Sequence, residues 1–156
     1  MKIINFISGT DLDGPKQIFA LYSEIMISLG HEVHPVIRKG VAFKLVPESL
    51  NYPIHEVNYS RVTQQFAKTS VINKLKAVIE SIKPDAIITH KSSDLEILRK
   101  AAGKNIRVID FVYWISSKHL KHVDGPVAIS EVIKKFSTRI MQQTLNNILK
   151  VEWSSS

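Results

Sequence analysis

Short apolar runs alternate along this chain with segments in which apolar residues recur every three or four positions. The runs are typical of buried strands, and we expect strands near residues 3–7, 32–37, 54–57, 85–89, 107–112 and 126–129. The spaced segments predict helices near residues 15–29, 70–82, 93–102 and 130–149. Strand followed by helix, repeated, predicts a single α/β domain over residues 1–156, with a Rossmann-like, doubly wound parallel sheet.

Local signals refine this prediction. The continuous apolar character of residues 3–7 favours a central strand with helices on both faces, whereas Pro35 places the second strand near a sheet edge. Gly14-Pro15 suits a helix start, and Ser93 with Glu96 forms a capping-box pattern. The first helix carries one apolar stripe, which we expect to face the sheet: Ile18, Leu21, Tyr22, Ile25, Met26 and Leu29.

The loops after the strands are the expected ligand-binding segments, because ligands gather at the carboxyl ends of parallel strands. These loops are residues 8–14, 89–94 and 112–122, together with Ser130. The first contains Gly9 and Gly14, which bring backbone N–H groups to a phosphate or a sugar, or simply form a tight turn. It has neither the Gly-x-Gly-x-x-Gly pattern nor Gly-Lys-Ser/Thr, and no acidic residue closes the second strand, which disfavours a nicotinamide cofactor.

Composition and charge narrow the function classes. The 156 residues include no cysteine and no apolar run of eighteen, and the first residues lack a signal-peptide layout, so we expect a cytoplasmic protein. The formal charge of +7 indicates either a polyanionic partner, such as an anionic membrane surface, or simple solubility. Lys and Arg are scattered, which disfavours specific nucleic-acid binding. His119 and His122 share a helical spacing, but only Asp124 lies nearby as a third ligand, and we expect no metal site.

Three motifs in order resemble the N-terminal, acceptor-side domain of family 4 GT-B glycosyltransferases. The first joins a strand and a glycine loop to a long helix and Leu29-Gly30-His31-Glu32-Val33. The second is Lys83-Pro84-Asp85-Ala86-Ile87-Ile88-Thr89-His90, similar to the family's Lys-Pro-Asp-Ile-Ile-x-x-His. The third is Val127-Ala128-Ile129-Ser130-Glu131, which resembles the family's Val-Ser-Glu helix start. Residues 38–69 carry little of the resemblance.

The resemblance implies which residues contact substrate, but it assigns no catalytic residue. The implied binding residues are Gly14, Lys16, His90, Ser93 and His119. The family's Gly-Gly-x-Glu loop reads Asp13-Gly14-Pro15-Lys16 here, so a carboxylate that repels a diphosphate and a lysine that attracts one have entered the loop. The family's donor domain, which binds the nucleotide sugar, has no counterpart in these 156 residues, and the last residues resemble the approach to the interdomain linker.

Two functional hypotheses follow. The first is the acceptor-binding half of a retaining sugar-nucleotide glycosyltransferase of bacterial cell-envelope or lipopolysaccharide-type synthesis, inactive alone and without a cofactor. A nucleotide sugar would then serve as donor only when a donor domain is supplied. Its expected partners are a second copy or a separate donor-domain polypeptide, and the inner membrane face. The second is a non-catalytic Rossmann-like or flavodoxin-like module that binds a phosphorylated small molecule or a protein partner.

Overall fold

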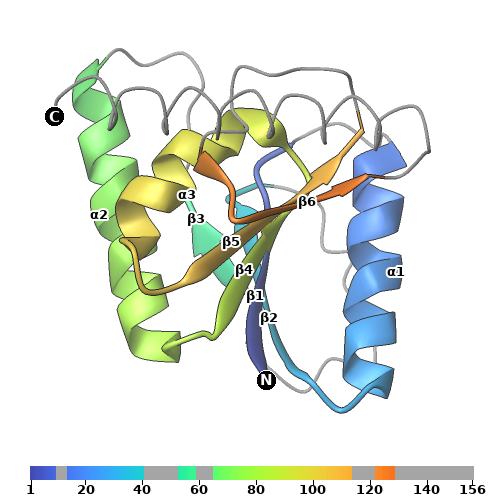
Figure 1. Cartoon of the computed structure of the whole chain (residues 1–156). Coiled ribbons are helices and arrows are strands. Elements are labelled where there is room, and N and C mark those ends of the chain that lie inside the picture. Colours follow the sequence, from blue (N-terminus) through green and yellow to red (C-terminus); the bar gives the residue numbers. More distant parts are fainter. Residues whose placement is uncertain (10–13, 41–52, 59–64, 114–121, 129–156) are drawn as a thin grey trace, which may run out of the picture.

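A computed structural model describes residues 1–9, 14–40, 53–58, 65–113 and 122–128 of the chain. These residues form a six-stranded sheet in the order β3-β2-β1-β4-β5-β6, in which every neighbouring pair is parallel (Figure 1). The strands are β1 (Lys2–Ile7), β2 (Glu32–Arg38), β3 (His55–Val57), β4 (Ala86–Thr89), β5 (Arg107–Val112) and β6 (Gly125–Ala128). The predicted parallel α/β fold is therefore confirmed, and β1 lies inside the sheet as its apolar run predicts.

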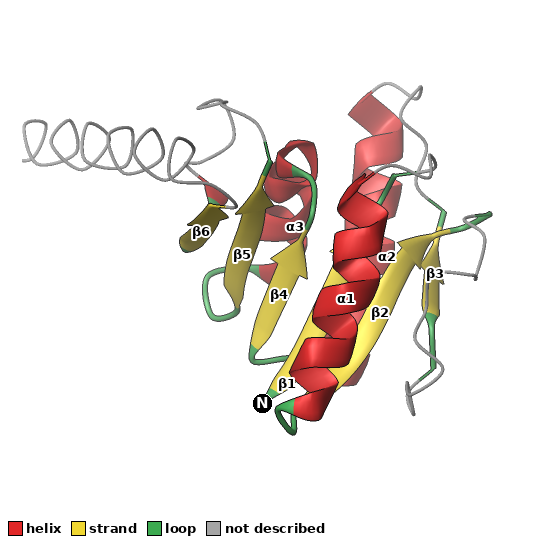
Figure 2. Ribbon diagram, turned by 90° about the vertical axis from the view of Figure 1, so that its right-hand side faces the viewer, coloured by secondary structure: helices red, strands yellow, loops and turns green. Residues whose placement is uncertain are grey.

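Helices cover both faces of the sheet, as a doubly wound fold requires. Helix α1 (Gly14–Ser28) packs on one face, and α2 (Gln65–Ile82) with α3 (Leu95–Ala102) packs on the other (Figure 2). Alternate residues of β1 point to opposite faces, so Ile3 contacts the α1-side core with Met26, while Ile4 and Phe6 enter the larger core beneath α2 and α3. The two-residue period of β1 thus determines which of the two cores each of these strand residues enters.

Three local predictions differ from the structure. Met26 of the expected stripe is buried, but Leu21, Ile25 and Leu29 are exposed, and α1 also buries Phe19 and Ser23, which the stripe did not include. Helix α2 begins at Gln65, five residues before the periodic segment starts. The predicted capping box is wrong: a 3-10 turn, η2 (Ser92–Asp94), precedes α3, whose N-cap is Asp94 without a side-chain cap hydrogen bond.

Pro35 is accommodated one strand in from the edge. Strand β3 pairs only with Val36–Arg38, so Pro35 lies outside the register of that edge strand. Because β3 has only three residues, none of them lies opposite Pro35, and the missing N–H of the proline interrupts no hydrogen bonding to the edge strand.

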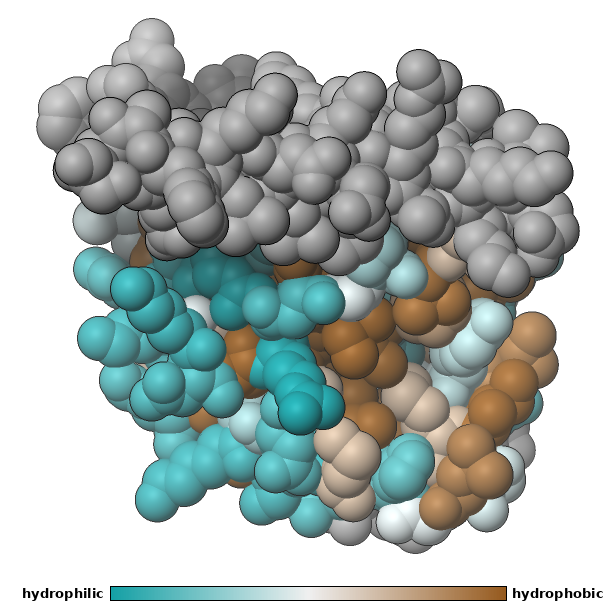
Figure 3. All heavy atoms as spheres, viewed as in Figure 1, coloured by the Kyte–Doolittle hydropathy of each residue, from teal (hydrophilic) through white to brown (hydrophobic). Residues whose placement is uncertain are grey.

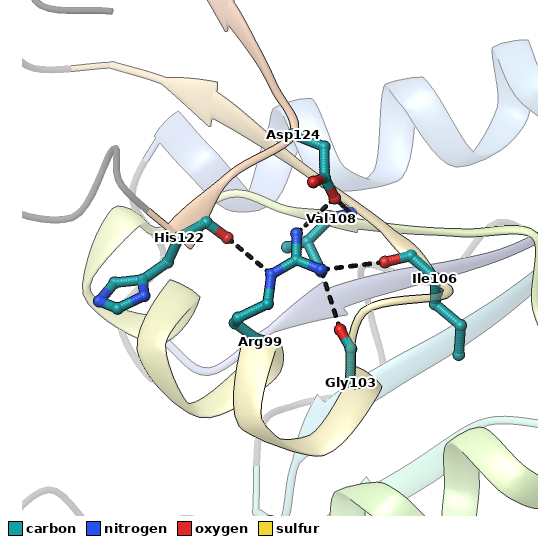
Figure 4. Close-up of polar contacts among 6 residues, drawn as sticks. All are labelled: Arg99, Gly103, Ile106, Val108, His122 and Asp124. Atoms are coloured by element: carbon teal, nitrogen blue, oxygen red, sulfur yellow. Dashed lines mark hydrogen bonds and ion pairs between the residues drawn. The ribbon is translucent and has the colours of Figure 1, made fainter. Parts of the chain in front are cut away.

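Arg99 of α3 forms hydrogen bonds to the residues just before β6 and to the loop between α3 and β5 (Figure 4). Its guanidinium donates to the carbonyl oxygens of His122 (3.2 Å), Gly103 (3.0 Å) and Ile106 (3.2 Å) and pairs with the Asp124 carboxylate. Asp124 also accepts the Val108 N–H at 2.7 Å. Burial pushes the pKa of Asp124 upward, but the Val108 and Arg99 hydrogen bonds and the charges of Arg99 and Arg107 outweigh it, so the pKa lies below its ordinary value.

The described surface is divided by polarity (Figure 3). Hydrophilic residues gather over α2 and α3, whereas the side formed by α1 carries hydrophobic residues, including the exposed Leu21, Ile25 and Leu29. Among the described helices, none is both long enough and apolar enough to cross a membrane.

Candidate functional site

The sheet has a topological switch point between β1 and β4. From β1 the chain moves outward through β2 to β3, then returns to the other side of β1 to form β4. The connections leave the carboxyl ends of β1 and β4 in opposite directions, and such a switch point is the place where parallel α/β sheets bind ligands. In Figure 1 this edge lies away from the N-terminus.

A buried polar network lies at this switch point. His90, directly after β4, has its Nε2 2.8 Å from Asn5 Oδ1 on β1 and its Nδ1 2.9 Å from the Tyr113 hydroxyl after β5. The Asn5 amide nitrogen donates to the Phe19 carbonyl (3.1 Å) and the Ser23 hydroxyl (2.7 Å) of α1. The network therefore joins β1 and the segments that follow β4 and β5 to the middle of α1.

Aromatic rings enclose the His90 imidazole. Phe111 stacks on it with a centroid separation of 5.1 Å, and Phe19 meets it edge-on at 5.7 Å. Burial in this apolar surrounding lowers the pKa of His90 to about 4, so the ring is neutral at physiological pH. Burial, with Tyr22 and Asp110 nearby, raises the pKa of the Tyr113 phenol, which keeps its proton.

A second polar cluster lies on the opposite face of the same edge. The carboxylate of Asp110 on β5 is completely buried and accepts the Ser92 hydroxyl at 2.6 Å, while its Oδ1 has no hydrogen-bond partner among the described residues. Burial raises the pKa of Asp110 to about 6; the Ser92 hydrogen bond opposes this shift, and the charge of Asp94 adds to it. Asp110 is thus an acid that changes charge near neutral pH.

The structure places the sequence-predicted binding residues as follows. His90 lies at the switch point, and Gly14 and Lys16 belong to the first turn of α1, whose residue Phe19 contacts the His90 ring. Ser93 is exposed in η2, on the chain segment that leaves β4. His119 lies outside the described residues. Gly14, Lys16 and His90 are therefore brought to the same edge, but both ring nitrogens of His90 already contact protein groups.

Sequence reasoning missed Asn5, Tyr113 and Asp110. Asn5 and Asp110 interrupt otherwise apolar strands, and a polar residue inside a buried strand is a signal that could have identified both. Tyr113 carries no such signal, because a tyrosine at the end of a strand is common. Within the described part of the chain, no group of three or more His, Asp or Glu residues has the arrangement of a metal site.

A groove of about 510 Å³ lies at the opposite, amino edge of the sheet, between the C-terminal ends of α2 and α3. Its charged lining residues are Lys76, Glu80, Lys83 and Lys100. Lys76 pairs with Glu80 at 3.8 Å and Lys100 with Glu96 at 2.8 Å, so the groove is a basic surface with partial internal pairing. It lies away from the switch point and contains none of the predicted binding residues.

Comparison with protein families identifies the family of this chain. Residues 18–149 match the family described as "Glycosyl transferase 4-like", and that span is most of the chain. The chain belongs to this glycosyltransferase family. None of the curated protein sequences matches it significantly.

Solved structures show that the glycosyltransferase domain has the fold of the N-terminal half of GT-B enzymes. The lipopolysaccharide outer core galactosyltransferase WaaB is 15% identical with a TM-score of 0.63, over 90% of this chain and 42% of its own. MurG of Acinetobacter baumannii is 12% identical with a TM-score of 0.64, over 85% and 42%. The UDP-GlcNAc 2-epimerase of Neisseria meningitidis is 15% identical with a TM-score of 0.66, over 89% and 43%. The chain thus spans about two-fifths of the length of these proteins.

Proposed function

We propose that this domain forms the acceptor-binding wall of a retaining sugar-nucleotide glycosyltransferase. The observation that carries the proposal is the family match over residues 18–149, combined with a buried polar network at the β1–β4 switch point. In this proposal the α1 N-terminus, with Gly14 and Lys16, binds a phosphate, and polar groups at the carboxyl ends of β4 and β5 bind sugar hydroxyls.

A bacterial cell-envelope glycan is the proposed product class. The support is a protein of the same fold, the lipopolysaccharide outer core galactosyltransferase WaaB. A sugar nucleotide would be the donor, and no cofactor is required by this proposal. The basic surface of α2 and α3 fits a cytoplasmic domain that contacts the anionic inner face of a membrane.

Sugar transfer requires a second wall in this proposal. A donor must be held opposite the acceptor, and a single wall neither orients the leaving diphosphate nor excludes water. We therefore expect no transfer by the 156-residue chain alone, with a second polypeptide or a second copy as its partner. The exposed apolar residues of α1 are a surface through which such a partner could pack.

The function is tested by NMR titration of the 156-residue chain with three kinds of ligand: neutral methyl glycosides, glucose 1-phosphate and UDP. Acceptor binding predicts shifts from the glycosides and the sugar phosphate that cluster at residues 14–19, 89–93 and 113. Shifts from UDP alone would refute the acceptor role and favour the alternative, a non-catalytic nucleotide-binding or phosphate-binding module. A radiometric transfer assay with a panel of nucleotide sugars and light scattering over a concentration series test the expected inactivity and the expected association.

A further inference from the structure

The network around His90 has a fixed direction of hydrogen bonding. Ser23 donates its hydroxyl proton to the Phe19 carbonyl at 2.8 Å, and the Asn5 amide nitrogen donates to that carbonyl and to Ser23 Oγ. A carbonyl oxygen only accepts, so this end of the network sets the orientation of the Asn5 amide, with its Oδ1 facing His90.

The orientation of Asn5 then determines the His90 tautomer. Because Asn5 Oδ1 can only accept, the proton of a neutral imidazole must reside on Nε2. Among the described residues, the hydrogen-bond and ring contacts of the imidazole are with Asn5, Tyr113, Phe19 and Phe111, and none of these four is acidic, so none of them stabilises an imidazolium through its own charge. His90 Nδ1 is therefore an acceptor, and the Tyr113 hydroxyl must donate to it.

We propose that Tyr113 is a specificity-determining residue that binds a donor group, a sugar hydroxyl, through its phenolic oxygen and does not bind a phosphate oxygen. The single hydroxyl proton of Tyr113 points inward to His90, so toward a ligand the oxygen offers only a lone pair. Tyr113 is half-buried directly after β5, at the carboxyl edge of the sheet where the switch point lies.

Two positions along this edge of the sheet therefore suit different ligand groups. The first turn of α1 presents N–H groups and suits an anion, whereas Tyr113 presents an acceptor and suits a hydroxyl. His90, with both nitrogens engaged and only 2% of its surface exposed, acts as a positioning residue for Tyr113. This inference rests on the proposed acceptor role and names the residue that selects a hydroxyl at that site.

The test compares the wild-type chain with Tyr113→Phe and with the matched control Tyr22→Phe. Tyr22 is also half-buried on the α1 face, and its ring centroid lies 4.4 Å from that of Phe111. Its substitution therefore removes a hydroxyl from the same aromatic cluster. The probes are methyl glycosides of galactose, glucose and N-acetylglucosamine, their deoxyfluoro analogues, and inorganic phosphate, each titrated by NMR.

We expect at least one glycoside to shift the Tyr113 ring resonances and to bind Tyr113→Phe about three- to tenfold more weakly, the effect of one neutral hydrogen bond. Tyr22→Phe should bind that glycoside like the wild type. Fluorine accepts but does not donate, so replacing the paired sugar hydroxyl should weaken binding to the wild type by a similar factor and leave binding to Tyr113→Phe unchanged. Inorganic phosphate should bind all three proteins equally.

Several results overturn the inference. One is unchanged glycoside affinity in Tyr113→Phe while shifts at residues 14–19 and 89–93 persist, which would leave the acceptor role standing. Another is a ¹⁵N spectrum that places the His90 proton on Nδ1, because the hydroxyl would then point outward. A third is the absence of any glycoside shift at Tyr113. Binding of UDP without any glycoside would remove the acceptor role itself.

Discussion

Acidification should change the stability of this domain in opposite directions through two buried groups, His90 and Asp110, which lie on opposite faces of the sheet. His90 stacks on Phe111 beneath α1, whereas Asp110 belongs to the face covered by α3. Burial lowers the pKa of His90 from 6.5 to about 4 and raises the pKa of Asp110 from 3.8 to about 6. Both groups prefer to be neutral, but acid charges the histidine and discharges the aspartate.

The sign of each contribution follows from which state binds more protons. For His90 the folded pKa lies below the unfolded value, so its stabilisation is complete above pH 6.5 and is lost as pH falls through about 4. For Asp110 the folded pKa lies above the unfolded value, so its stabilisation is complete below pH 3.8 and is lost as pH rises through about 6. Each full change corresponds to about 3 kcal/mol, of which about 2 kcal/mol falls between pH 7 and pH 4.5.

Urea unfolding at pH 7 and pH 4.5 separates the two contributions in single variants. Asp110→Asn keeps an acceptor for Ser92 and, of the two groups, leaves only the histidine to titrate, so relative to the wild type the variant should lose about 2 kcal/mol of unfolding free energy on acidification. His90→Gln leaves only the aspartate of the two and should gain about 2 kcal/mol relative to the wild type. In the wild type these two effects nearly cancel, and the remaining acids affect all three proteins alike.

Equal pH dependence of all three proteins, within about 0.5 kcal/mol, would refute the reasoning, since that spread is the ordinary effect of a neutral substitution. If His90→Gln does not fold, Asp110→Asn still decides the matter against the wild type. Direct NMR titration of the His90 ring is the independent check: a pKa near 6.5 in the folded protein would contradict its burial in a neutral aromatic surrounding.

Three further predictions concern other parts of the domain. Arg99→Met removes the guanidinium donor from three carbonyl oxygens and from Asp124, and should lower the free energy of unfolding in urea by about 2–3 kcal/mol, after a reduction for partial exposure. The exposed Lys100→Met should lower it by under about 0.5 kcal/mol, and equal losses would contradict the role given to Arg99. Lys16→Ala should weaken glucose 1-phosphate binding severalfold and reduce its salt dependence, and Gly14→Val should block the close approach of the phosphate, as seen by NMR titration of a correctly folded variant; an unchanged affinity in both would move the anion site elsewhere. Changing the groove residues Lys76, Lys83 and Lys100 to glutamine should weaken binding to vesicles that contain phosphatidylglycerol by about 1 kcal/mol per lysine, as measured by vesicle sedimentation. A variant that still binds fully would exclude this surface.

Up to residue 128, the sequence alone was sufficient for the succession of strands and α-helices, because these are specified by short-range hydrophobic periods. The helix predicted over residues 130–149 lies outside the described residues. The strand Arg107–Val112 has the predicted bounds, and the strand at His55–Val57 lies within the predicted segment. The apolar continuity of Lys2–Ile7 also indicated its position inside the sheet. Three ordered motifs indicated the family, which the match over residues 18–149 confirms.

Only the tertiary structure decided which side of α1 is buried. Apolar residues extend over more than half of the helix circumference, so the period alone did not separate the face with Phe19 and Met26 from the face with Leu21 and Ile25. Packing against Asn5 selected the face that carries Ser23, because a buried amide needs a hydrogen-bond partner.

The candidate site was likewise decided by tertiary structure. His90 could be singled out from its place after a strand, but its partners lie 85 and 23 residues away along the chain, one on β1 and one directly after β5. No local pattern encodes such a contact, since it depends on the order in which the strands are assembled. The sequence thus predicted which edge of the sheet binds a ligand, and the strand order determined which side chains meet at that edge and which atoms of His90, Asn5 and Tyr113 donate hydrogen bonds there.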